Sequence, residues 1–196
     1  QGLTLGNLEQ LRTSTSEHGY IVRKGGKPDG LRAYPVNAPP FSIAGCDMRG
    51  YLVVPAYDLQ AGELLTLQFI PPDNGKKLNL PGRSMAGAFT IPTTAQGACT
   101  YIVEGIGQAW SAAAATGGGA VVAFGAGNME KAAKALIANG RPARSLVLVA
   151  DVGKADKCRQ WLKPGLWLGG RAKLRKGDRH RRGARVVRDD DDHGDD

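Results

Sequence analysis

Cysteine, aromatic residues and long apolar runs are all scarce in this chain of 196 residues. Its three cysteines, Cys46, Cys99 and Cys158, are widely spaced and fit neither a zinc-ligand pattern nor a disulfide framework. We expect reduced thiols, as in a cytosolic protein. Aromatic residues make up 6% of the chain and 28 residues are glycine, which favours a small-residue α/β interior over an aromatic-rich sandwich.

No segment approaches 18 consecutive apolar residues, so the sequence predicts no transmembrane helix and no membrane partner. The amino end has no basic segment followed by an apolar one, so no secretion signal is expected. Together with the reduced cysteines, this absence predicts a cytoplasmic location.

Charge is distributed unevenly around a net value of +8. Basic residues dominate positions 171–188, whereas positions 189–196 contain six aspartates. Neither stretch has the apolar content to form a core, so we expect residues 171–196 to be a charged, disordered tail. The rest of the chain is mildly basic, which fits a polyanionic partner without establishing one.

The segment from Thr100 to Asp151 has the pattern strand, helix, strand, helix, strand. The expected strands are 100–103, 119–125 and 145–151, with helices at 110–116 and 128–139. Parallel strands joined by right-handed crossovers end at the same edge of a sheet, so Glu104 and Asp151 should face one crevice. Two carboxylates at such an edge can hold a divalent cation such as Mg²⁺.

The first half of the chain predicts a different, antiparallel arrangement. Residues 50–55 and 63–70 read as a strand pair joined by a short loop, with one face of the second strand buried and the other partly polar. We therefore expect a small antiparallel β-rich subdomain over 1–95 and a second domain over 96–170, before the tail.

Two basic segments are candidate phosphate contacts. The loop at 71–84 contains Lys76, Lys77, Asn79 and Arg83, whose donors can hold a phosphate backbone or a triphosphate, although an ordinary exposed hairpin tip has the same composition. Arg23 and Lys24 form a second cluster, for which a solvated charged turn is an equal alternative.

Val103-Glu104-Gly105 after one strand and Ala150-Asp151 after a later strand resemble the Toprim domain, the metal-binding module of topoisomerases, bacterial primases and some nucleases. The preceding blocks at 49–70 and 75–82 are similar to the segment before Toprim in DNA primases of conjugative plasmids and phages. The resemblance covers roughly residues 18 to 165. It implies an α/β fold (α+β overall), with a mostly parallel Toprim-like sheet and flanking helices behind the antiparallel subdomain.

The resemblance also implies an activity, which is the synthesis of RNA primers on single-stranded DNA from ribonucleoside triphosphates. Glu104 and Asp151 would then be the catalytic and metal-binding residues, with Mg²⁺ or Mn²⁺ as cofactor, and the basic residues named above would contact template or nucleotide. The chain has neither a zinc-ribbon pattern nor a helicase phosphate-binding loop, so a helicase partner would be another chain or segment.

One motif departs from that family. Many Toprim domains carry Asp-x-Asp at the last strand, whereas this chain has Asp151-Val-Gly153, and the next acid is Asp156. Plasmid-primase-like sequences are similar here, with Lys154 placed to contact a phosphate. The departure keeps two alternatives open, a non-catalytic DNA-binding accessory protein with a degenerate site and a Toprim-type nuclease.

Overall fold

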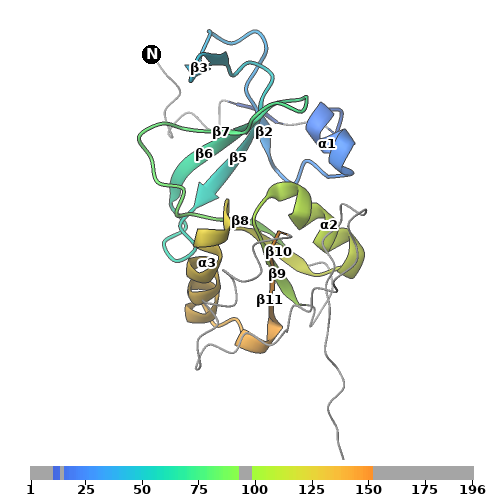
Figure 1. Cartoon of the computed structure of the whole chain (residues 1–196), viewed down its shortest axis with the longest axis vertical. Helices are drawn as coiled ribbons and strands as arrows, with labels where there is room; N and C mark the ends of the chain where they lie inside the picture. The colour runs from blue at the N-terminus through green and yellow to red at the C-terminus, as the bar shows by residue number, and fades with distance from the viewer. Residues whose placement is uncertain (1–10, 14–15, 93–98, 152–196) are drawn as a thin grey trace, which may run out of the picture.

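The computed structural model describes residues 11–13, 16–92 and 99–151. Two main sheets lie one beyond the other along the long axis of the molecule, with the amino-terminal sheet uppermost in Figure 1. The first sheet is antiparallel throughout, and the second combines three parallel strands with one antiparallel strand. The predicted mixed α/β architecture is present, and its parallel part is limited to three strands among the described residues.

The amino-terminal sheet has the strand order β1-β2-β5-β6-β7. Its central pair is the expected hairpin, in which Leu52 pairs with Ile70. The carboxylate of Asp58 closes the loop of this hairpin by accepting hydrogen bonds from the backbone amides of Gln60 and Ala61. The five strands are β1 (Arg12–Thr13), β2 (Arg32–Ala33), β5 (Leu52–Tyr57), β6 (Leu64–Ile70) and β7 (Leu78–Asn79).

The face of β6 expected to be partly polar does carry Thr66 and Gln68, but the strand is buried on both faces. Leu67 and Phe69 pack into one apolar cluster, while Ile70, on the opposite face, packs into another. Thr66 and Gln68 share that opposite face and are buried with it. The face with Thr66 and Gln68 is buried because the carboxyl-terminal sheet and its first helix pack against it. The alternation of residues within one strand cannot reveal such packing.

The carboxyl-terminal sheet has the order β11-β9-β10-β8. Val103 at the end of β9 pairs in parallel with Val122 and Val149, so the three parallel strands end at the same level. The fourth strand, β8, precedes the expected domain boundary in sequence, yet it pairs antiparallel with β10. The four strands are β8 (Phe89–Ile91), β9 (Thr100–Val103), β10 (Gly119–Val122) and β11 (Leu146–Val149), with the 3₁₀ turn η2 (Ala143–Ser145) before β11.

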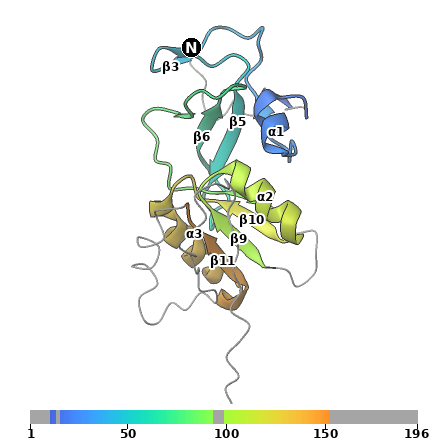
Figure 2. The same ribbon diagram turned by 45° about the vertical axis from the view of Figure 1, so that its right-hand side comes forward.

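Two helices cover opposite faces of this sheet (Figure 2). Helix α2 (Ile106–Thr116) packs on the face that carries Tyr101 and Val103, whereas α3 (Ala126–Ala138) packs on the face that carries Ile102. The loops after the adjacent strands β9 and β10 therefore lead to opposite sides. Such a divergence opens a crevice at the carboxyl ends of the strands, where α/β sheets bind their ligands.

Helix α1 (Gly19–Lys24) joins the two halves of the molecule by packing on α2. The ring of Tyr20 lies 6.0 Å from that of Trp110, and the indole nitrogen of Trp110 donates a 2.7 Å hydrogen bond to Asp29. A Cβ atom on Gly26 would lie 2.3 Å from the indole ring, so only glycine allows the turn after α1 to approach so closely. One apolar cluster thus runs through both sheets.

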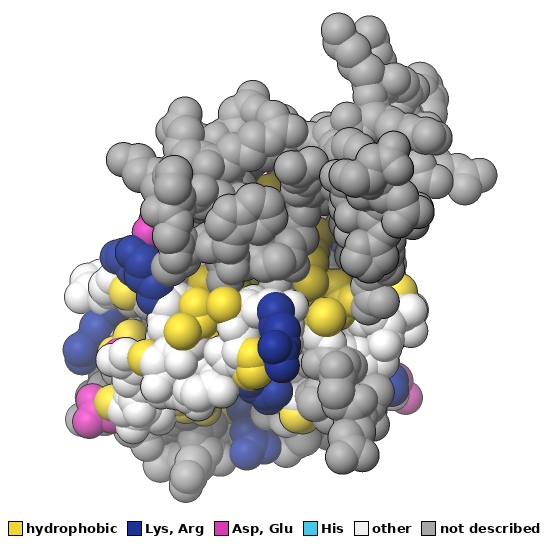
Figure 3. Space-filling model, turned by 90° about the horizontal axis from the view of Figure 1, so that it is seen from below, with side chains coloured by type: hydrophobic (Ala, Val, Ile, Leu, Met, Phe, Trp, Pro, Cys, Tyr) yellow, Lys and Arg dark blue, Asp and Glu magenta, His cyan; other side chains and the backbone are white. Residues whose placement is uncertain are grey.

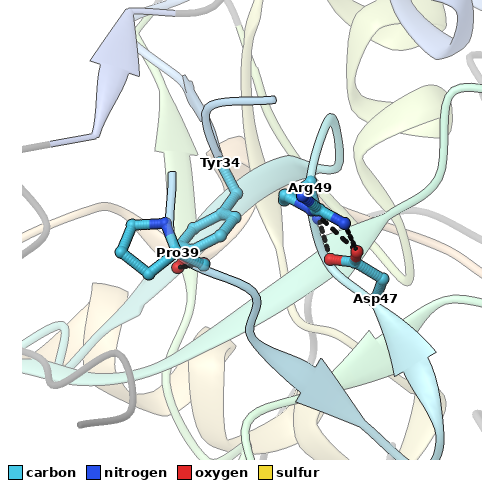
Figure 4. Close-up of polar contacts among 4 residues, drawn as sticks. All are labelled: Tyr34, Pro39, Asp47 and Arg49. Atoms are coloured by element: carbon cyan, nitrogen blue, oxygen red, sulfur yellow. Dashed lines mark hydrogen bonds and ion pairs between the residues drawn. The ribbon is translucent and has the colours of Figure 1, made fainter. Parts of the chain in front are cut away.

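A small hairpin, formed by β3 (Ser42–Ile43) and β4 (Cys46–Asp47), extends from the amino-terminal sheet. Two polar contacts stabilise its base (Figure 4). The Tyr34 hydroxyl donates to the Pro39 carbonyl at 2.9 Å, and Arg49 Nε donates to Asp47 Oδ2 at 2.7 Å. The hydrogen bonds from Arg49 hold the pKa of Asp47 below its usual value. This hairpin is remote from the carboxyl ends of the parallel strands.

Helix α2 begins at Ile106, four residues before the predicted start, and therefore includes Gly107 in its first turn. The other predicted helix is present with shifted ends, and none of the helices in the described ranges is long and apolar enough to cross a bilayer. Lys154, Asp156, Cys158 and the tail at 171–196 lie outside the described residues, as does the expected domain boundary between residues 95 and 96.

Candidate functional site

Glu104 and Asp151 lie at the same edge of the carboxyl-terminal sheet. Glu104 directly follows β9, and Asp151 comes two residues after the end of β11. Because Val103 and Val149 are paired in parallel register, Glu104 stands level with Ala150, one residue before Asp151. The strand order thus brings together two acids that are 47 positions apart in the sequence.

The side chain of Gln108 connects the two acidic segments. Its Oε1 atom accepts hydrogen bonds from the backbone amides of Glu104 and Gly105, each at 3.0 Å. Its Nε2 atom donates to Oδ1 of Asp151. Because two N–H groups point at one end of the carboxamide, that end is the oxygen, and the NH₂ group must face Asp151. Gln108 thereby ties the start of α2 to the end of β11.

The two carboxylates have different surroundings. Glu104 is half-buried and its Oε1 atom is shielded from solvent, whereas Asp151 is exposed. Carboxylate oxygens are the ligands that Mg²⁺ and Mn²⁺ prefer, so this pair is chemically suited to a hard divalent cation. Within the described ranges, however, no group of three or more aspartate, glutamate, histidine or cysteine side chains could hold a metal ion. A cation here would keep several of its water molecules.

Two lysines from the amino-terminal half stand beside the first turn of α2. The Nζ atom of Lys77 lies 3.5 Å from the position that a Cβ atom on Gly105 would take, and 5.3 Å from the centre of the Tyr20 ring. The side-chain carbons of Lys24 lie 3.4 to 3.5 Å from the corresponding position on Gly107. Both lysines are exposed, so their charges face solvent at the edge that carries Glu104.

The other predicted contact residues are placed differently. Arg23 donates to the backbone carbonyls of Pro72 and Asp73, so it fixes the basic loop to α1. The side-chain oxygen of Asn79 accepts a hydrogen bond from the buried Gln68 at 3.1 Å, which ties β7 to β6. Lys76 and Arg83 are exposed residues of the same loop, and Lys154 lies outside the described residues. Lys24 and Lys77 are therefore the predicted cations that the structure brings to the first turn of α2.

Sequence reasoning did not identify Gln108 or Tyr20 as parts of this site. Gln108 stands three residues after Gly105, and a glutamine at that spacing from a helix start is a capping-box signal. The signal was hidden because Gly105 and Gly107 together read as a turn. Tyr20 shows no sequence signal of its own, since its role depends on how α1 packs against α2.

A hollow of about 520 Å³ lies between α3 and the loop of the β5–β6 hairpin, away from the two acidic segments in sequence. Alanine makes up half of its lining, which also includes Asp58, Lys131 and Lys134. Lys134 forms a 2.7 Å ion pair with Glu130. The view from below the molecule shows lysine and arginine side chains beside hydrophobic ones, with acidic side chains only at the margin (Figure 3). Among the described residues, neither surface carries the paired carboxylates that metal-assisted chemistry needs.

The edge of the carboxyl-terminal sheet therefore combines two carboxylates, a bridging carboxamide and two lysines. Oxygen ligands beside cationic side chains suit the binding of a phosphate ester together with a hard cation. A scan of protein-family models, a search of curated proteins and a search of solved structures each found no match to this chain.

Proposed function

We propose that this chain is the catalytic, Toprim-containing portion of a DNA primase, which synthesises RNA primers on single-stranded DNA during plasmid or phage replication or transfer. We place it in the cytoplasm, with any helicase supplied by another chain or domain. The observation that supports this proposal best is the bridge from Gln108 to both acidic segments. The proposal itself comes from the motifs at Glu104 and Asp151.

Glu104 and Asp151 would hold one Mg²⁺ or Mn²⁺ ion. When bound, the ion would neutralise charge on the triphosphate of the incoming ribonucleotide. The low count of protein ligands leaves room for phosphate oxygens and water, which is how Mg²⁺ is usually held with nucleotide substrates. The half-buried position of Glu104 strengthens its interaction with a cation, because partial exclusion of water lowers the local dielectric constant.

Lys24 and Lys77 would bind phosphate groups of the nucleotide or the template. Packing of Lys77 against the ring of Tyr20 and of Lys24 against Gly107 limits the freedom of both side chains. A pre-positioned cation loses less entropy when phosphate binds, and it orients the substrate relative to the acidic pair. Arg23 would act indirectly, by holding the loop that carries Lys77.

The test is incorporation of labelled ribonucleotides on single-stranded DNA with Mg²⁺ or Mn²⁺. We expect wild-type protein to make short RNA products, and Glu104→Ala or Asp151→Ala to abolish them without unfolding the protein. Glu63→Ala is the matched control, since Glu63 is an exposed acid just before β6 and belongs to neither acidic segment. Full activity in both edge variants would refute the assignment, and cleaved template in place of extended products would indicate a nuclease.

A second candidate is a DNA-binding accessory protein with a degenerate metal site. It is favoured by the small ligand set in the described ranges and by the hydrogen bond that already engages Asp151. The same preparation separates the two candidates. Binding of single-stranded DNA that persists in Glu104→Ala, with no synthesis by the wild type, would favour the accessory protein.

A further inference from the structure

Gln108 makes the polar contacts that link the two acidic segments, which gives it a specific position in the candidate site. It reaches the edge from the first turn of α2, the helix that begins just after Glu104. We propose that Gln108 is a positioning residue that orients Asp151 toward the cation and sets how tightly the edge binds it. This inference rests on the proposed metal site of the primase function.

Gln108 holds the backbone at Glu104. The amides of Glu104 and Gly105 precede the first helical residue, so no carbonyl of α2 can accept from them. Gln108 Oε1 accepts from both. This pair of hydrogen bonds fixes the direction in which the chain leaves β9 and hence where the Glu104 side chain begins.

Gln108 also contacts Asp151, which is exposed and is the last residue that the structure describes. An exposed carboxylate samples several rotamers unless a partner restrains it. The NH₂ group of Gln108 supplies that restraint by donating to Oδ1. Hydrogen bonds of this kind to metal-binding carboxylates typically change metal affinity by about 10- to 100-fold when they are removed.

Substitution can separate the roles of the oxygen and the NH₂ group of Gln108. Gln108→Glu keeps an oxygen that accepts from both backbone amides, so the helix cap is retained. It replaces the donor to Asp151 with a negative charge. The edge then has three carboxylates, which repel one another without a cation and together bind a cation more tightly. Gln108→Met has a similar length and loses both the cap and the contact to Asp151.

The experiment titrates Mn²⁺ against the full chain and its variants, with free Mn²⁺ measured by electron paramagnetic resonance. Thermal unfolding is recorded with and without the ion. We expect Gln108→Met to bind Mn²⁺ about 10-fold more weakly than wild type. Gln108→Glu should bind Mn²⁺ more tightly than wild type. Its melting temperature should be lower without Mn²⁺ and should rise more when Mn²⁺ is added. Gln60→Glu, the same charge change at an exposed position of the β5–β6 loop, should behave as wild type.

The outcomes distinguish this inference from the proposed function. If Gln108→Met binds Mn²⁺ as tightly as wild type, and Gln108→Glu has the same affinity and melting behaviour as Gln60→Glu, Gln108 is only a helix cap and the inference fails. Primer synthesis that depends on Glu104 would still support the primase in that case. If the affinity order holds but no variant makes primers, the positioning role stands and the primase proposal fails.

Discussion

Replacing Gly26 with alanine should test whether the two halves of the molecule form one packed unit. The new methyl carbon would lie 2.3, 2.4 and 2.6 Å from three carbon atoms of the Trp110 ring. Ordinary contacts of a Cβ atom begin at 3.4 Å, so the ring or the turn must move by more than 1 Å. Trp110 has little room to move, because it is buried, bound to Asp29 and packed near Tyr20.

Overpacking of this kind usually costs about 1–3 kcal/mol of folding free energy. We expect Gly26→Ala to fall in that range, measured as the free energy of unfolding in urea with circular dichroism as the probe. Tryptophan fluorescence should report the change as well, since the displaced residue is itself an indole.

Gly127→Ala provides the matched control in the opposite direction. Gly127 lies in helix α3, has no positive φ angle, and a Cβ atom there would meet nothing within 4 Å. Alanine in a helix is favoured over glycine by about 0.5–1 kcal/mol, so this variant should be stabilised. Wild-type stability in Gly26→Ala, or equal effects of the two substitutions, would show that the turn after α1 does not press against Trp110.

Three further predictions concern single side chains. His18 accepts a hydrogen bond from the amide of Tyr20 and contacts the carbonyl of Gly50, and burial lowers its pKa below the usual 6.5. The contribution of His18 to the unfolding free energy should therefore be full above pH 6.5 and decline as the pH falls below it. His18→Asn should flatten that decline in urea titrations from about pH 7 to 5. Thr66 Oγ1 is buried without a hydrogen-bond partner among the described residues, so Thr66→Val should raise the unfolding free energy by about 1 kcal/mol, and a loss would reveal a missed partner. Lys77→Ala should weaken binding of single-stranded oligonucleotides and reduce the salt slope of log K by about 0.7, whereas an unchanged slope would remove Lys77 from the interface.

The strands of the parallel unit could be predicted because their signal is local. Thr100–Val103 is a short apolar run of β-favouring residues that leads into Glu104 and a glycine, and β9 has those bounds. Two apolar runs follow at helix-spaced intervals, which is typical of a parallel unit. The common edge for Glu104 and Asp151 follows from this order alone.

What could not be predicted depends on packing between distant segments. Gly107 reads as a turn residue, yet it belongs to α2, where a Cβ atom would lie 3.3 Å from the Tyr20 hydroxyl. The β8 strand has three residues, too few for a periodic pattern, and it is defined by its pairing with β10. Gln108 has a local capping signal, but its contact to Asp151 appears only when β9 and β11 are adjacent.

The pairing of β8 with β10 has a consequence for dissecting the protein. A fragment that starts at residue 96 would include the parallel strands but not β8, so one side of β10 would present unpaired backbone amides and carbonyls. Such an open edge recruits other strands and promotes self-association. A fragment that starts before Ala88 retains the protecting strand and should self-associate less than the shorter one.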